Sequence, residues 1–164
     1  MNNGKSSLEL LKENLSSVNL SLNRLLYSYD ACVQVGLKDS YTEEEFVSFE
    51  AMTSRYARTT DMLINKVLRS LDVVEYIESG TIIDAVNNTE KRGIAEAHSL
   101  RKLKDLRNSI AHEYITENII RFFGNVLEYT PLLKNSIEKL NIYCTKYVYK
   151  HSNSLTVPPN ETEN

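Results

Sequence analysis

Residues that break helices are sparse along this chain, and their scarcity limits the folds open to it. In 164 residues there are five glycines and three prolines, so long stretches contain nothing that ends a helix. Between Ser7 and Val35, leucine and valine recur at steps of three and four residues, the spacing of a helix with one apolar face. Strand-like alternation is scarce. The sequence therefore predicts an all-α fold, an up-and-down bundle of about five helices.

Capping residues and helix breakers indicate where the helices begin and end. Thr42 precedes three glutamates and is a typical N-cap, since these acids lie at the positive end of the helix dipole. Thr81 and Asp84 resemble a capping box. Pro131 has no N–H to donate and is expected to interrupt the last helix. Helices are predicted at 7–35, 43–78, 82–92, from about 96 into 107–114, and at 116–150 with a break at Pro131; Gly36, Gly80 and Gly93 act as stops.

Length and composition suit one domain. Hydrophobic residues make up 41% of the chain, enough to build a core in a globular protein of this size. We expect residues 5–151 to form this domain, and 152–164, with Pro158-Pro159 and no apolar periodicity, to form a disordered tail. Cys32 and Cys144 have no Cys or His neighbours at metal-ligand spacing. We therefore expect free buried thiols and no metal site.

The lengths of the apolar segments bear on whether the protein is expected in a membrane or in the cytoplasm. No apolar run approaches the roughly 20 residues that a membrane-spanning helix needs. The first five residues lack the apolar core of a signal peptide. A cytoplasmic protein without a membrane partner is expected.

Basic residues cluster in two places although the net charge is -3, so any attraction to nucleic acid must be local. Residues 91–107 hold six cations and two acids, which gives a local charge of +4. On the second predicted helix, cations repeat at a separation of 11 residues and so return to nearly the same face. Both groups are either ordinary solvated faces or surfaces for a phosphate backbone. The predicted RNA-binding residues are Arg101, Lys102 and Lys104, and the second stripe is Arg55, Arg58, Lys66 and Arg69.

Residues 107–114 read Arg-Asn-Ser-Ile-Ala-His-Glu-Tyr, and this octet carries the chemistry of the chain. Cleavage of a phosphodiester by its 2′-hydroxyl needs a base, an acid and a cation for the phosphorane charge. An imidazole serves as base or acid near neutral pH. The carboxylates show no ligand spacing, so a metal-independent scheme is the more economical one. Arg107 and His112 are the candidate catalytic residues.

The spacing of the pair adds a geometric condition. Five residues on a continuous helix separate Arg107 from His112 by about 140°, whereas Asn108 and His112 share a face. Either the helix ends near His112, or two subunits complete the site. In a homodimer, two copies of each side chain could converge on one phosphate.

The octet, Arg, four residues, His, one residue, Tyr, with a polar residue directly after the arginine, resembles the HEPN superfamily. Within it the chain is similar to HepT-type toxins of nucleotidyltransferase-paired toxin–antitoxin systems. The resemblance implies a HEPN-like bundle and a cofactor-free, metal-independent endoribonuclease that works as a homodimer. Arg107 and His112 would be catalytic, and Asn108 would assist them. Tyr114 would be the tyrosine to which a minimal nucleotidyltransferase antitoxin, using ATP, attaches AMP.

Two other functions remain open at this point. A non-catalytic HEPN subunit would present substrate or nucleotide to a nucleotidyltransferase, with Arg107 and His112 gripping phosphate only. A helical scaffold would carry no chemistry at all.

Overall fold

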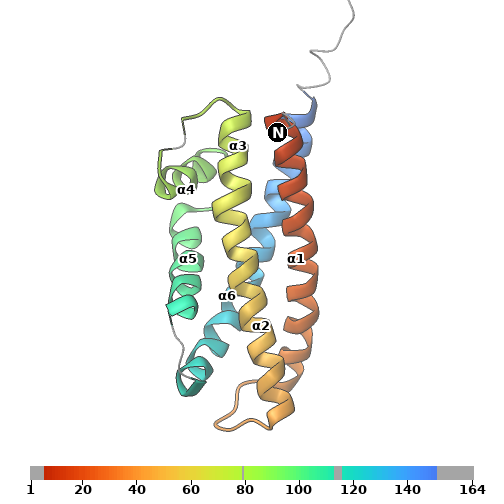
Figure 1. Cartoon of the computed structure of the whole chain (residues 1–164), viewed down its shortest axis with the longest axis vertical. Coiled ribbons are helices and arrows are strands. Elements are labelled where there is room, and N and C mark those ends of the chain that lie inside the picture. Colours follow the sequence, from red (N-terminus) through yellow and green to blue (C-terminus); the bar gives the residue numbers. More distant parts are fainter. Residues whose placement is uncertain (1–5, 79, 113–115, 151–164) are drawn as a thin grey trace, which may run out of the picture.

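The computed structural model describes residues 6–78, 80–112 and 116–150, and this part of the chain is helical with no strand. Its five continuous helices form an up-and-down bundle (Figure 1), which confirms the predicted all-α fold. We call α2, η1 and α3 together the long helix. The elements are α1 (Ser7–Val35), α2 (Glu43–Met62), the π-helical η1 (Leu63–Leu68), α3 (Arg69–Val74), α4 (Ile82–Lys91), α5 (Ala97–His112), α6 (Thr116–Tyr143) and the π-helical η2 (Cys144–Val148), which continues α6.

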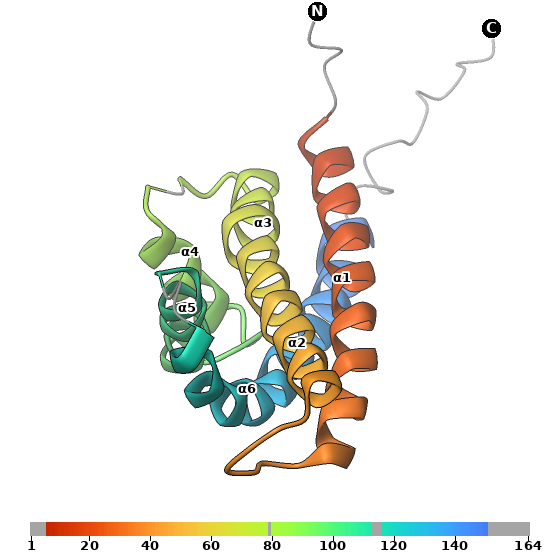
Figure 2. The ribbon, with the colours of Figure 1, turned by 60° about the horizontal axis from the view of Figure 1, so that its bottom comes forward.

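The arrangement of the helices places α5 and α1 on either side of the long helix. α1 and the long helix run antiparallel, and α5 also runs antiparallel to the long helix (Figure 1). α6 passes behind the long helix and ends beside the start of α1 (Figure 2). Reciprocal hydrogen bonds of 3.0 and 2.8 Å between the amides of Asn19 and Asn141 join α1 to α6. One face of the long helix is therefore left open between α1 and α5.

The helix starts are fixed by the predicted capping residues. The Thr42 hydroxyl accepts from the Glu45 amide at 3.2 Å, and the Glu45 carboxylate accepts from the Thr42 amide at 3.1 Å. Thr81 and Asp84 form the same reciprocal box at the start of α4. Gly36 and Gly93 follow α1 and α4 with φ of 74° and 69°, conformations that favour glycine. These boundaries are confirmed.

The core is built from the apolar stripes of all five helices. The Phe49 and Phe123 rings are stacked with centroids 4.5 Å apart, which joins the long helix to α6. Cys32 and Cys144 are buried and free, as predicted. Burial raises the pKa of Cys32 to about 11 and that of Cys144 to about 12. Both thiols are therefore packing residues.

Two predicted helix boundaries are wrong. The long helix ends at Val74 and not near Glu78, because Tyr76 adopts a φ of 56° and the Ile77 amide donates back to the Asp72 carbonyl at 2.9 Å. Gly80 therefore has no part in ending it. α6 continues through Pro131 without interruption. Pro131 lies on the exposed side, while the buried neighbours Val126, Thr130 and Leu133 hold both halves against the core.

Two parts of the chain carry predictions that the structure does not test. The expected disordered tail, 152–164, and the octet residue Tyr114 lie outside the described residues. Among the helices of the described part, none is both long and apolar enough to cross a bilayer.

Candidate active site

The apolar face of α5 anchors the candidate site to the long helix. Leu100, Leu103 and Leu106 of α5 are buried in the core. The buried Tyr56 hydroxyl of α2 donates to the Leu103 carbonyl at 3.2 Å. Burial raises the pKa of Tyr56 well above its usual range, so this phenol stays a hydrogen-bond donor. The turn of α5 that carries Arg107 is therefore held against α2.

Arg107 faces the long helix and forms an ion pair there. Its Nη2 lies 2.6 Å from Oδ1 of Asp61, and both side chains are 33% exposed. The same carboxylate oxygen accepts from Nδ2 of Asn65 at 2.8 Å. Nη1 of Arg107 donates to Oδ1 of Asn108 at 3.1 Å. Asp61, Asn65, Arg107 and Asn108 thus form a polar cluster across the two helices.

The Asp61–Arg107 pair orients the guanidinium but leaves it accessible to a ligand. Ion pairs with this much solvent contact contribute on the order of 1 kcal/mol or less. A phosphate oxygen offers a guanidinium the same kind of charged acceptor as a carboxylate. Arg107 can therefore exchange Asp61 for a phosphate at little cost.

His112 is the last residue of α5 and is exposed. Along a continuous helix it lies about 7.5 Å beyond Arg107 and about 140° around the axis. The structure therefore brings Arg107 and Asn108 together and places His112 at the helix end, away from the polar cluster.

The three predicted RNA-binding residues have different surroundings. Arg101 is exposed and donates to the Asn87 amide oxygen of α4 at 2.7 Å. Lys102 is exposed and Lys104 is half-buried.

Arg92 was counted in the basic run 91–107, but it does not belong to the basic surface. Its side chain is 5% exposed and lies 2.6 Å from Asp72 and 2.7 Å from Glu75. Burial alone would lower the pKa of Arg92, but its hydrogen bonds to these two carboxylates outweigh burial and raise it. The local charge that faces solvent is smaller than the sequence count of +4.

Two members of the polar cluster, Asp61 and Asn65, were missed in the sequence. Asp61 is the only carboxylate between Glu50 and Asp72, a stretch that otherwise carries cations, and Asn65 stands four residues later. A single carboxylate among cations on one helix is a sequence signal for an ion-pair partner. The partner helix could not have been inferred, because a helical pattern does not say which neighbour covers each side.

The described residues contain no group of three or more His, Cys, Asp or Glu side chains placed to hold a metal ion. No model of a known protein family matches the chain, and comparisons with curated proteins and with solved structures also found no match. The resemblance to the HEPN superfamily rests on the octet and the helical pattern alone.

Proposed function

We propose that this chain is a metal-independent endoribonuclease toxin of the HEPN type, paired in the cytoplasm with a nucleotidyltransferase antitoxin. The observation that carries the proposal is the polar cluster on α5 and the long helix. It holds Arg107 half-exposed beside Asn108, on the same helix as an exposed His112. Each predicted catalytic side chain is thus reachable by a ligand.

The residues divide the steps of phosphodiester cleavage between them. His112, neutral, takes the proton of a 2′-hydroxyl, whose oxygen forms a bond to phosphorus. The bond from phosphorus to the 5′-oxygen breaks, and that oxygen takes a proton from an acid. Arg107 stabilises the negative charge of the phosphorane, and Asn108 holds the guanidinium through its 3.1 Å hydrogen bond. The products are a 2′,3′-cyclic phosphate and a 5′-hydroxyl.

A homodimer completes this scheme. One imidazole cannot be base and acid in the same step, and Arg107 and His112 point in different directions on one α5. His112 of the partner subunit would supply the acid. Two Arg107 side chains would then face the same phosphate, so we propose that the active form is a dimer joined near the end of α5.

Inhibition by the antitoxin follows from charge. AMP attached to Tyr114 would place a phosphate beside the cationic groups that bind RNA and would block the strand. The structure does not describe Tyr114, so this part of the proposal rests on the octet in the sequence.

The second candidate is a non-catalytic subunit that binds substrate or nucleotide for a nucleotidyltransferase. The Asp61–Arg107 ion pair favours this binding function. An arginine that exchanges a carboxylate for a phosphate can bind a ligand without taking part in cleavage.

Induced expression in bacteria separates the two functions. We expect wild-type protein to arrest growth and fragment total RNA, and His112→Ala to do neither. Tyr114→Phe should remain toxic in the presence of the antitoxin, because it cannot be modified. Normal growth and intact RNA with the wild type would favour the binding subunit.

A further inference from the structure

A groove between α1 and the long helix is lined by an unusual set of charges. It consists of two hollows of about 460 and 220 Å³. Their nearest lining residues on α1, Asn14 and Ser17, are three positions apart, a rise of about 4.5 Å along the helix. We call both hollows together the α1 groove. Its charged lining residues are Arg24, Arg55, Arg58, Lys66 and Arg69.

The lining of the α1 groove contains five cations and no carboxylate. The whole chain has 22 acids and 19 lysines and arginines, so this segregation runs against the composition. Of the stripe predicted from the 11-residue spacing, Arg55 and Arg58 line the smaller hollow, and Lys66 and Arg69 line the larger one. The α1 groove would attract a polyanion although the protein as a whole is acidic.

Most of these cations are free to bind a ligand. Within the described part of the chain, Lys66 and Arg69 have no ion pair, and both are exposed. Arg55 alone is tied down, since its Nη1 donates to the Arg24 carbonyl at 3.0 Å and to the Ser28 hydroxyl. Lysine and arginine offer donors and no acceptor, so an anion rich in oxygen is the matching ligand.

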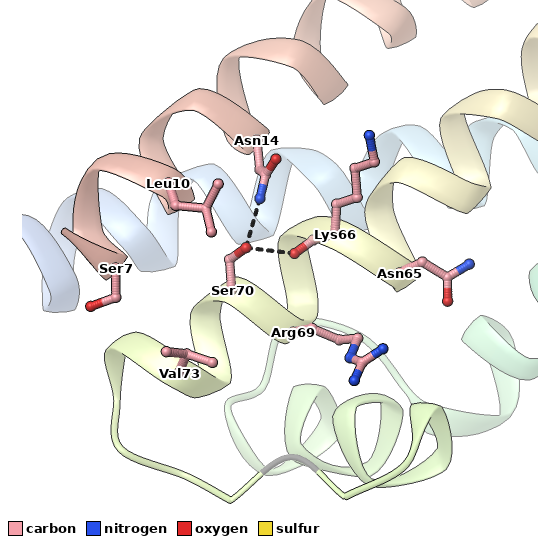
Figure 3. Close-up of a pocket in the computed structure, with 8 residues that line it drawn as sticks. All are labelled: Ser7, Leu10, Asn14, Asn65, Lys66, Arg69, Ser70 and Val73. Carbon is pink, nitrogen blue, oxygen red and sulfur yellow. Dashed lines mark hydrogen bonds between the residues drawn. The ribbon is translucent and has the colours of Figure 1, made fainter. Parts of the chain in front are cut away.

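Hydrogen bonds join residues of α1 and the long helix that line the larger hollow. Asn14 donates to the Ser70 hydroxyl at 2.6 Å, and that hydroxyl donates to the Lys66 carbonyl at 2.7 Å. Figure 3 shows Asn14 and Ser70 meeting between the two helices, with the side chains of Lys66 and Arg69 both extending to the right of Ser70, Lys66 above and Arg69 below. Both cationic side chains line the hollow and are exposed, so a strand that lies across it can reach them.

A chain of hydrogen bonds links the α1 groove to the candidate active site. Asn65 lines the larger hollow and donates to Asp61 at 2.8 Å, and Asp61 accepts from Arg107 at 2.6 Å. Along the long helix, Asp61 and Arg69 are eight residues apart, about 12 Å at the usual rise. A strand with one phosphate at Arg107 would reach the groove with its next ones.

We propose that the α1 groove binds the phosphate backbone of single-stranded RNA, on the strand whose scissile phosphate lies at Arg107; this inference rests on the proposed ribonuclease function. No aromatic ring lines either hollow, so the groove lacks a platform on which bases stack. Binding there is therefore independent of base sequence.

The test measures binding of a fluorescein-labelled single-stranded RNA of about 12 nucleotides by anisotropy at several salt concentrations. The parent is the full chain with His112→Ala, which leaves the RNA intact. The groove variant adds Lys66→Ala and Arg69→Ala. The control adds Lys139→Ala and Lys146→Ala, two exposed cations of α6 and η2 outside the groove. Circular dichroism and melting temperature check that all three fold alike.

We expect the groove variant to bind more weakly and with less salt dependence. Each phosphate contact on a single strand contributes about 0.7 to the slope of log K against log salt, so the loss of two contacts lowers the slope by about 1.4. The control should match the parent, and oligo(A) and oligo(U) should lose affinity equally.

Three outcomes would overturn the proposal that the α1 groove binds RNA. The groove variant and the control could bind RNA with the same affinity, the groove variant could bind as tightly as the parent, or the parent could fail to bind RNA. The last would point to an acidic protein as the occupant. Failure of the ribonuclease function looks different. In that case the unmutated chain does not cut RNA, while the difference between the groove variant and the control persists.

Discussion

Among single residues, we expect Asp61 to weaken the attraction of Arg107 for a phosphate, because the two side chains form an ion pair. The Asp61→Asn variant removes a negative charge 2.6 Å from the guanidinium and keeps an acceptor for it. We expect tighter RNA binding and a free energy of unfolding changed by no more than about 1 kcal/mol. Anisotropy and urea denaturation measure the two quantities.

The matched control for Asp61 is Asp105→Asn, which removes an exposed carboxylate of α5. Within the described part of the chain, this carboxylate has no ion pair. Equal effects of the two variants would show that only net charge matters. Weaker binding by Asp61→Asn would show that the carboxylate positions Arg107 for the ligand.

The backbone of Tyr76 is strained, and the side chain makes no buried contacts that offset the strain. Its φ is 56°, a left-handed conformation, and the residue is 97% exposed. Tyr76→Gly should therefore raise the free energy of unfolding by about 1 kcal/mol. Tyr27→Gly, at an exposed tyrosine inside α1, should lower it by roughly 0.5 kcal/mol. Urea denaturation of both variants is the measurement, and destabilisation by Tyr76→Gly would contradict the account.

Residue identities predicted the caps and the octet but not their neighbours. Thr42, Thr81 and Gly36 could be placed because capping depends on a few local atoms. The long helix ends beside Tyr76, four residues before the glycine that was expected to end it. Asp61 could not be assigned to Arg107, because 46 residues of sequence separate them.

At the scale of elements, Arg92 clamps α3, α4 and α6 together. It pairs with Asp72 and Glu75, and the Tyr143 hydroxyl donates to Glu75 at 2.7 Å. Burial and the hydrogen bond to Glu75 raise the pKa of Tyr143 to about 12, so this phenol keeps its proton. The three helices therefore meet around one buried guanidinium.

Removal of that guanidinium should be costly. Arg92→Met leaves Asp72, whose side chain is 0% exposed, without its cation. We expect the free energy of unfolding to fall by about 3–5 kcal/mol. Lys91→Met, at the exposed neighbouring position, should change it by about 0.5 kcal/mol or less. Chemical denaturation compares them; equal small effects would mean that the clamp contributes nothing.

The cap of α2 makes stability depend on acid. Hydrogen bonds from Lys38 and Thr42 lower the pKa of Glu45 below its ordinary 4.5. Because the folded pKa is lower than the unfolded one, the contribution is complete above the unfolded pKa and is lost as pH falls through the folded pKa. Glu45→Gln keeps a capping side chain but not the charge. It should destabilise the protein at about pH 7 and not at about pH 3; an equal effect at both pH values in urea denaturation would contradict this.

Element boundaries were predictable wherever local signals agreed. The extent of α1 follows from its apolar period and its following glycine. The predicted break at Pro131 is wrong, because burial of the residues around it outweighs the hydrogen bond that proline removes from the helix. The π-helical segments η1 and η2 have no local signature in the sequence.

In the whole molecule, the open face of the long helix lies between α1 and α5. α5 carries Arg107 to one side of that face, and α1 forms a cationic groove on the other. Helix count and fold class could be predicted from the scarcity of breakers. The groove could not, since a stripe of cations on one helix becomes a groove only when a second helix lies beside it.

Cleavage of a labelled RNA by purified protein in excess EDTA tests the proposal that Arg107 and His112 cleave RNA without a metal ion. We expect the wild type and His98→Ala, a control at an exposed histidine of α5, to cut at equal rates. His112→Ala should be slower by about 10²–10⁴-fold. Equal cleavage by His112→Ala, or cleavage abolished by EDTA, would contradict the account.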